Sequence, residues 1–105
     1  MEGRKVIYVF DIDGTLCTLV KNAEYKKAQP LINRIEKVNR LYDEGHYIKL
    51  YTARGSQTGI DWTDITKDQL SKWKLKFHEL IINCKPHGDL FVDDKAISAD
   101  LFFSS

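Results

Sequence analysis

The sequence of 105 residues is poor in features that mark secreted or membrane proteins. It has only two cysteines, Cys17 and Cys84, which form neither a Cys-x-x-Cys motif nor a zinc-binding pattern. We expect both to be reduced thiols, as is usual in the cytoplasm. The apolar run near the N-terminus, Val6–Phe10, is too short for a signal peptide or a membrane span. These absences predict a cytoplasmic protein with no membrane partner.

An excess of one charge is also lacking, since sixteen basic and fifteen acidic residues leave a formal net charge of +1. Nucleic acids and anionic membranes are bound through clustered basic residues, so this balance predicts neither as a partner. Repeats, low-complexity tracts and linkers rich in proline, glycine or serine are absent as well. A chain of this length can build one modest core, and we expect residues 1–105 to form a single domain.

Short apolar runs separated by helix-like segments are what the sequence does contain. Val6–Phe10 is a continuous run of β-branched and aromatic residues, which is typical of a buried parallel strand. Residues 47–51, 80–82 and 90–92 predict three further strands. The irregular segment 16–29 predicts a loop or a small hairpin.

Two helices are predicted between these strands. Pro30 is placed as a first helical position, and Gly45 as the residue that stops the first helix. Its apolar side is predicted to carry Leu31, Ile35, Val38 and Tyr42, with Arg34, Lys37 and Arg40 facing outward. A capping box at Thr66 predicts the start of the second helix, whose apolar stripe consists of Leu70, Trp73 and Phe77.

Alternating strands and helices predict an α/β fold with a small, mostly parallel sheet covered on both faces, a Rossmann-like three-layer αβα sandwich. In such sheets, ligands bind beyond the carboxyl ends of the strands. Polar residues follow each predicted strand: Asp11 and Asp13 the first, Thr52 the second, Lys85 the third, and Asp93 and Asp94 the fourth. Each residue alone is as easily explained as a helix cap, a turn or a surface charge. Four strand ends together favour a single site.

These residue types suit the hydrolysis of a phosphate monoester. A carboxylate nucleophile divides the displacement into two easier steps, and a second carboxyl group serves as acid and then as base. Asp11 and Asp13 are two apart on extended backbone, so they point the same way. Clustered carboxylates repel a phosphate, and Mg²⁺ relieves this because it binds carboxylate, phosphate and water oxygens. Lys85 can neutralise charge on the transferring group, and Thr52 can donate a hydrogen bond to it.

Residues 11–15, DIDGT, resemble the D-x-D-G-T signature of the haloacid dehalogenase superfamily of phosphatases. Thr52, Lys85 and the Asp93-Asp94 pair resemble its later motifs, so the likeness spans residues 6–94. It implies Asp11 as nucleophile and Asp13 as general acid and base. It also implies Mg²⁺ held by Asp11, the Asp13 backbone carbonyl and Asp93, with Asp94 binding directly or through water. Lys85 follows Asn-Cys, where relatives often have glycine.

Superfamily members usually carry a cap domain, and this sequence has no room for one, either in residues 16–29 or between Lys85 and Leu90. Residues 66–73, 85–86 and 92–96 resemble the short capless sugar-phosphate phosphatases associated with surface-polysaccharide synthesis, which implies a small sugar phosphate as substrate. The missing cap and the apolar residues 101–103 predict a homo-oligomer in which a neighbouring subunit completes the pocket.

Several alternatives remain open at this stage. The substrate can instead be a nucleotide or a phosphoprotein. A receiver-like phosphoacceptor domain uses similar residues, but there the acidic pair comes first and here it comes last. A third alternative is a binding domain without catalysis. Arg54 is either a substrate-binding residue or a surface arginine, and Trp62 is a candidate for stacking on a ligand.

Overall fold

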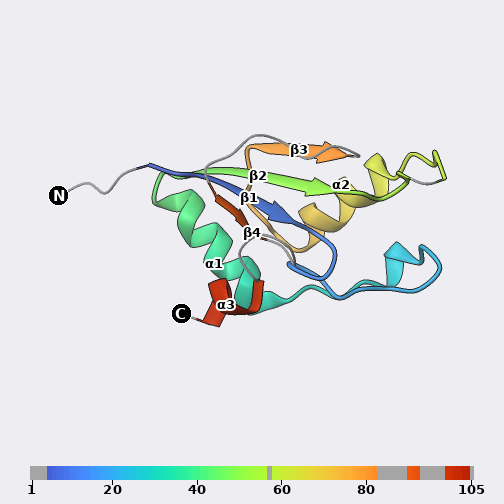
Figure 1. The fold of residues 1–105 in the computed structure, drawn as a ribbon, viewed down its shortest axis with the longest axis horizontal. Helices are drawn as coiled ribbons and strands as arrows, with labels where there is room; N and C mark the ends of the chain where they lie inside the picture. The colour runs from blue at the N-terminus through green and yellow to red at the C-terminus, as the bar shows by residue number, and fades with distance from the viewer. Residues whose placement is uncertain (1–4, 57, 83–89, 93–98, 105) are drawn as a thin grey trace.

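The computed structural model describes residues 5–56, 58–82, 90–92 and 99–104 (Figure 1). Along the chain, its elements are β1 (Ile7–Asp11), a 3₁₀ turn η1 (Tyr25–Lys27), α1 (Ile32–Asp43), β2 (Tyr47–Thr52), α2 (Thr63–Lys72), β3 (Glu79–Ile82), β4 (Leu90–Val92) and α3 (Ala99–Ser104). The four predicted strands are confirmed, each to within one residue at either end.

The four strands form one parallel sheet in the order β3-β2-β1-β4. β1 lies at its centre, where Phe10 pairs with Leu50 of β2 on one side and with Val92 of β4 on the other. Figure 1 shows the arrows of the sheet running in the same direction, so their carboxyl ends share one edge. This is a small α/β fold compatible with a Rossmann-like arrangement.

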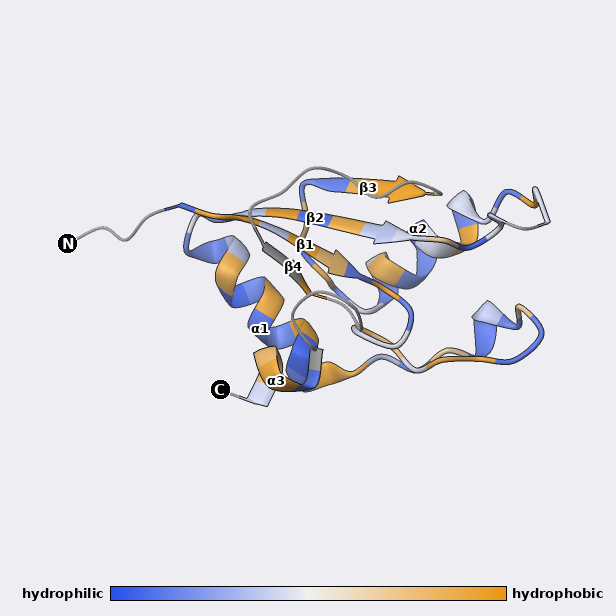
Figure 2. Cartoon of the chain, in the orientation of Figure 1, coloured by the Kyte–Doolittle hydropathy of each residue, from blue (hydrophilic) through white to orange (hydrophobic). Residues whose placement is uncertain are grey.

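One face of the sheet is covered by the described helices. Phe10 and Leu50 pack in one cluster with Ile35 and Val38 of α1 and with Leu70 of α2. The steps from β1 to β2 and from β2 to β3 run in the same direction, and right-handed connections then place both helices on the same face. Figure 2 shows hydrophilic and hydrophobic bands alternating on α1, as in a helix covered on one side. A second helical layer is not confirmed by the described part of the chain.

The first helix begins later than the sequence predicts. Pro30 forms an isolated bridge with Cys17 instead of opening the helix, and the Leu31 amide donates to the Leu16 carbonyl at 2.9 Å. These contacts hold the chain extended up to Leu31, the N-cap of α1. The predicted stop is confirmed, because Gly45 follows the helix with a φ of +95° that favours glycine.

The second helix begins three residues before the predicted capping box. The Thr63 amide donates to the Asp61 carboxylate at 2.9 Å, and hydrogen bonds from Thr63 lower the pKa of Asp61. Thr66 is therefore a buried residue inside α2 rather than its cap. Trp73 follows the helix as its C-cap, and Phe77 lies beyond it. Both nevertheless pack against the core, as predicted for Trp73.

α3 packs across α1 and changes the role of two charged residues. Arg34 bonds to Asp100 at 2.5 Å, and the Lys37 ammonium donates to the Phe102 carbonyl at 2.8 Å. The prediction that these two cations face outward is therefore wrong, because α3 covers them. Phe102 and Phe103 pack against the core, whereas Leu101 is 69% exposed. None of the helices in the described ranges combines the length and the apolar character needed to cross a bilayer.

Candidate active site

The two aspartates of the D-x-D-G-T segment lie at the carboxyl end of the central strand. The Ile12 amide continues the sheet by donating to the Tyr51 carbonyl at 3.1 Å. The Ile12 carbonyl then accepts amide hydrogen bonds from Thr15, Leu16 and Cys17, which close a tight buried turn. Ile12 thus anchors the segment in the core. A pocket of about 280 Å³ beside it is lined by Asp11, Asp13, Leu19, Val20, Tyr25, Ala53 and Arg54.

Thr52 ends the neighbouring strand and reaches the same place. Its side chain is fully buried, and its hydroxyl donates to Oδ2 of Asp13 at 2.9 Å. The hydroxyl oxygen also accepts a hydrogen bond from the Arg54 amide at 3.2 Å. The sequence predicted that this hydroxyl serves a substrate phosphate. Its single proton is directed at Asp13 here, so Thr52 orients that carboxylate.

Arg54 is neither at the surface nor free to bind a ligand, since it is only 1% exposed. Its Nη2 and Nε donate to Oδ1 of Asp13 at 2.8 and 3.1 Å. Its Nη1 donates to the hydroxyl of Thr66 at 3.0 Å and to Oε1 of Gln69 at 2.7 Å. The guanidinium also lies over the Tyr25 ring, 4.5 Å from its centroid. Every guanidinium nitrogen therefore donates to a protein group.

This arrangement corrects the sequence-based interpretation of Arg54. A guanidinium has five N–H donors in a rigid plane, and those of Arg54 are directed at Asp13 on one side and α2 on the other. Direct binding of a substrate phosphate does not match this geometry. Arg54 instead links α2 to Asp13, so the orientation of the Asp13 carboxylate depends on the position of α2. Thr66 and Gln69 were missed as partners because Thr66 was assigned to the helix cap.

Cys17 is a buried thiol next to the same carboxylate. Its Sγ lies 3.8 Å from Oδ1 of Asp13 and 3.6 Å from the Ile12 carbonyl oxygen. Burial and the nearby Asp13 charge raise the pKa of Cys17 to about 12, and Arg54 only partly opposes this. The thiol therefore stays protonated.

The donor set suits magnesium as far as it is described. Asp11 and Asp13 line one pocket and are residues with oxygen ligands, and Cys17 offers no thiolate, so a hard cation is favoured over a soft one. Within the described ranges, no three His, Cys, Asp or Glu residues group as a metal site. Mg²⁺ needs only one or two carboxylates with further oxygen ligands, and Asp11 with the backbone carbonyl of Asp13 fits that requirement.

Three predicted site residues, Lys85, Asp93 and Asp94, lie outside the described residues. They follow β3 and β4, whose last described residues are Ile82 and Val92. Their assignment to the site stays a prediction.

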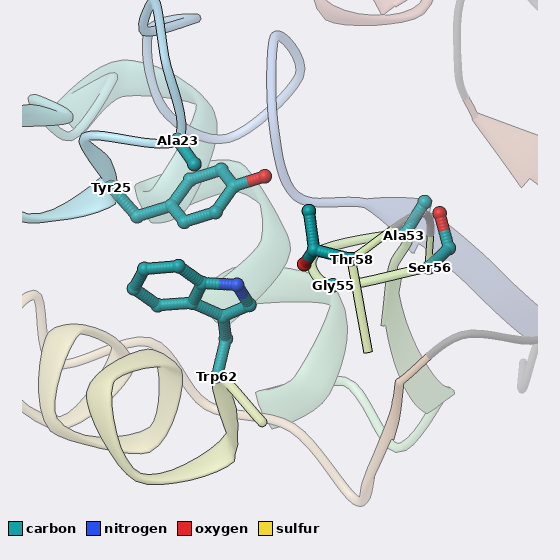
Figure 3. A pocket seen from close by; sticks show the side chains of 7 residues that line it. All are labelled: Ala23, Tyr25, Ala53, Gly55, Ser56, Thr58 and Trp62. Carbon is teal, nitrogen blue, oxygen red and sulfur yellow. The ribbon is translucent and has the colours of Figure 1, made fainter. Parts of the chain in front are cut away.

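A second pocket, of about 230 Å³, shares Tyr25 and Ala53 with the first. Figure 3 shows the rings of Tyr25 and Trp62 on one side of it and Ser56 and Thr58 on the other. The ring centroids are 4.9 Å apart at an interplanar angle of 80°. Trp62 was a sequence candidate, whereas Tyr25 was missed. Its only signal was an aromatic residue within a polar, irregular segment.

No family model and no curated protein matches this chain. A crystal structure of a structural-genomics target from Vibrio cholerae is similar, with a TM-score of 0.75 and 25% sequence identity. The match covers 97% of this chain and 89% of that chain. The name of that protein states no activity, so the likeness concerns the α/β fold.

Proposed function

We propose that this protein is a Mg²⁺-dependent phosphomonoester hydrolase of the haloacid dehalogenase type, acting through a phosphorylated Asp11. The observation that carries the proposal is the placement of Asp11 and Asp13 in one pocket at the carboxyl end of the central strand, with Thr52 bonded to Asp13. Ligands of open parallel sheets bind at this edge. The expected substrate is a small sugar phosphate.

The reaction takes place in two balanced steps. A carboxylate oxygen of Asp11 forms a bond to phosphorus while the bond to the ester oxygen breaks, and the leaving oxygen takes the proton of the Asp13 carboxyl. A water molecule then attacks the same phosphorus and gives a proton to the Asp13 carboxylate. The bond between phosphorus and Asp11 breaks, and inorganic phosphate leaves.

Two buried residues prepare Asp13 for this exchange of protons. The Thr52 hydroxyl fixes Oδ2 and the Arg54 guanidinium fixes Oδ1, so the carboxylate cannot rotate away from the pocket. In the second step Asp13 acts as the carboxylate that accepts the proton of water. Lys85 is proposed to neutralise charge on the transferring phosphoryl group.

Magnesium is proposed to be held by Asp11, the backbone carbonyl of Asp13 and Asp93, with Asp94 direct or through water. When bound, the ion neutralises charge on the phosphoryl oxygens and on the clustered carboxylates.

The test is the Asp11→Asn variant. We expect phosphate release to fall by several orders of magnitude while the fold is kept, because the amide cannot form the acyl phosphate. Hexose phosphates, nucleoside monophosphates and phosphoserine peptides serve as substrates, so the nucleotide and phosphoprotein alternatives are tested together. Acid quenching and mass spectrometry would show phosphate on the peptide that contains Asp11. Slow turnover with a long-lived phosphorylated protein would favour the receiver alternative.

Asp43→Asn is the matched control, because Asp43 is an exposed residue of α1 paired with Lys76. It should leave turnover unchanged. Wild-type rates in a folded Asp11→Asn protein would refute the covalent mechanism.

We also propose that the protein forms a homo-oligomer. The exposed side chains of Leu19 and Leu101 support this, at 75% and 69% exposure. Light scattering during size-exclusion chromatography gives the mass directly, and a monomer of 12.2 kDa would refute it.

A further inference from the structure

We propose that the pocket between Tyr25 and Trp62 binds the leaving group of the phosphate ester, and that this group is a single polyhydroxylated ring rather than a nucleobase. The inference rests on the proposed function, since it assumes a phosphoryl group beside Asp11. The pocket shares Tyr25 and Ala53 with the pocket that Asp11 and Asp13 line. A ligand with its phosphate at Asp11 therefore extends naturally into it.

The size and lining of the pocket suit a small polar ring. Its volume of about 230 Å³ lies below the roughly 300–1,000 Å³ of pockets for drug-sized ligands. Hydroxyls of Tyr25, Ser56 and Thr58 line it, and none of its lining residues in the described ranges is charged. Hydroxyl groups both donate and accept, as the hydroxyls of a sugar do. The aromatic rings offer apolar contact to the C–H face of the same ligand.

The geometry of the two rings argues against a nucleobase. Tyr25 and Trp62 already touch edge to face, with centroids 4.9 Å apart and planes at 80°. A base sandwiched between aromatic rings needs two parallel faces with a gap between them, and this pair has neither. Figure 3 shows the two rings on one side of the pocket and the hydroxyl-bearing side chains of Ser56 and Thr58 on the other.

Both aromatic residues are held in place by neighbouring residues. The Arg54 guanidinium lies over the Tyr25 ring, and the Tyr25 carbonyl accepts a hydrogen bond from the Gln69 side-chain amide. Trp62 packs close to Gly55, where an added Cβ would lie 3.0 Å from Cδ1 of the indole. A site whose walls are fixed before binding loses less conformational freedom when the ligand enters.

The binding test uses tryptophan fluorescence in an inactive protein. The sequence has two tryptophans, so Trp73→Phe combined with Asp11→Asn leaves Trp62 as the single reporter. The probes are the 1- and 6-phosphates of glucose, mannose and galactose, with AMP and inorganic phosphate for comparison. We expect a saturable change for at least one hexose phosphate, with a Kd about 10-fold below those of AMP and phosphate. No saturable change with any hexose phosphate, or binding of AMP as tight as the best of them, would overturn the proposal.

A kinetic test distinguishes an effect on ligand binding in this pocket from an effect on the phosphoryl-transfer step. Trp62→Leu should lower kcat/KM for the best hexose phosphate about 10-fold more than for acetyl phosphate, which is too small to fill the pocket. Trp73→Leu is the matched control and should affect both substrates alike, because Trp73 lies outside this pocket. An equal loss on both substrates in Trp62→Leu would contradict the proposal. If no ester is hydrolysed by the wild type, the proposed function fails, and the fluorescence experiment still decides the pocket.

Discussion

The guanidinium of Arg54 and the carboxylate of Asp13 form an ion pair of 2.8 Å in which the arginine side chain is 1% exposed and the aspartate 21%. A pair of this kind is costly to break, because the charge that remains is buried without a partner. It also fixes direction, since a planar guanidinium holds a carboxylate in one plane. Stability and the orientation of Asp13 are therefore coupled in one contact.

Replacing this arginine by lysine tests that coupling. Arg54→Lys keeps the positive charge. It loses the planar guanidinium that donates hydrogen bonds to Asp13, Thr66 and Gln69. We expect the free energy of unfolding to fall by about 3 kcal/mol, measured by urea denaturation. We expect kcat to fall by about 10²-fold, since the variant misplaces a proton-transfer group.

The matched control is the exposed ion pair between Lys76 and Asp43, also 2.8 Å long. Lys76→Ala should change the free energy of unfolding by less than about 1 kcal/mol, because exposed pairs contribute little. Equal losses of unfolding free energy in Arg54→Lys and Lys76→Ala would show that burial of the Arg54–Asp13 pair does not add to its contribution to stability.

Cys17 should resist alkylation in the folded protein. With a pKa of about 12 in place of 9.0, it carries about 10³-fold less thiolate at pH 8 than an ordinary cysteine. The sign follows from the raised pKa: reactivity increases only as the pH rises towards 12. Peptide mapping after iodoacetamide treatment at pH 8 should find Cys17 unmodified in native protein and modified in urea. Rapid labelling of Cys17 in the native state would contradict this.

Gly55 should be sensitive to substitution by alanine. Its φ is +85°, and an added Cβ would lie 2.1 Å from the Ile60 carbonyl oxygen, so the backbone must move. We expect Gly55→Ala to lower the free energy of unfolding by about 3 kcal/mol, the upper range for overpacking. Gly59→Ala is the control, because Gly59 has a φ of +76° with no atom within 4 Å of the added Cβ. It should cost about 1 kcal/mol, the strain of a positive φ alone.

Phosphate release should require magnesium. We expect activity to disappear in EDTA, to return with Mg²⁺ and to be inhibited by Ca²⁺, which is larger and tolerates more ligands. A phosphate-release assay with metal-free protein measures each effect. Full activity in excess chelator, with elemental analysis finding no retained metal, would rule out the proposed metal dependence.

The sequence predicted the elements that depend on local pattern. The run before Asp11 predicted the central strand, and Gly45 predicted the end of the first helix, because both signals lie within a few neighbouring residues. The meeting of Asp13 and Thr52 also followed from sequence, since parallel strands end at one edge of their sheet.

The parts that the sequence did not predict depend on contacts between distant residues. Arg54 is 41 positions from Asp13 and 15 from Gln69, and no periodicity relates them. α2 begins early because the Thr63 amide donates a hydrogen bond to the Asp61 carboxylate. In the sequence, this start was as plausible as the capping box at Thr66. Tyr25 belongs to no periodic pattern in the sequence, because its position depends on a contact with the distant Arg54.

The segment that carries Tyr25 is closed at its base. The Thr18 amide donates to the Gln29 carbonyl, and the Gln29 amide donates to the Thr18 hydroxyl, both at 2.9 Å. Because these bonds hold the two ends together, lengthening such a loop adds little entropic cost. Residues between Lys21 and Glu24 can therefore be exchanged or extended while β1 and the Arg54–Asp13 pair keep their places. Under the proposed function, the tip of this loop is the place to change substrate selectivity while the catalytic carboxylates stay unchanged.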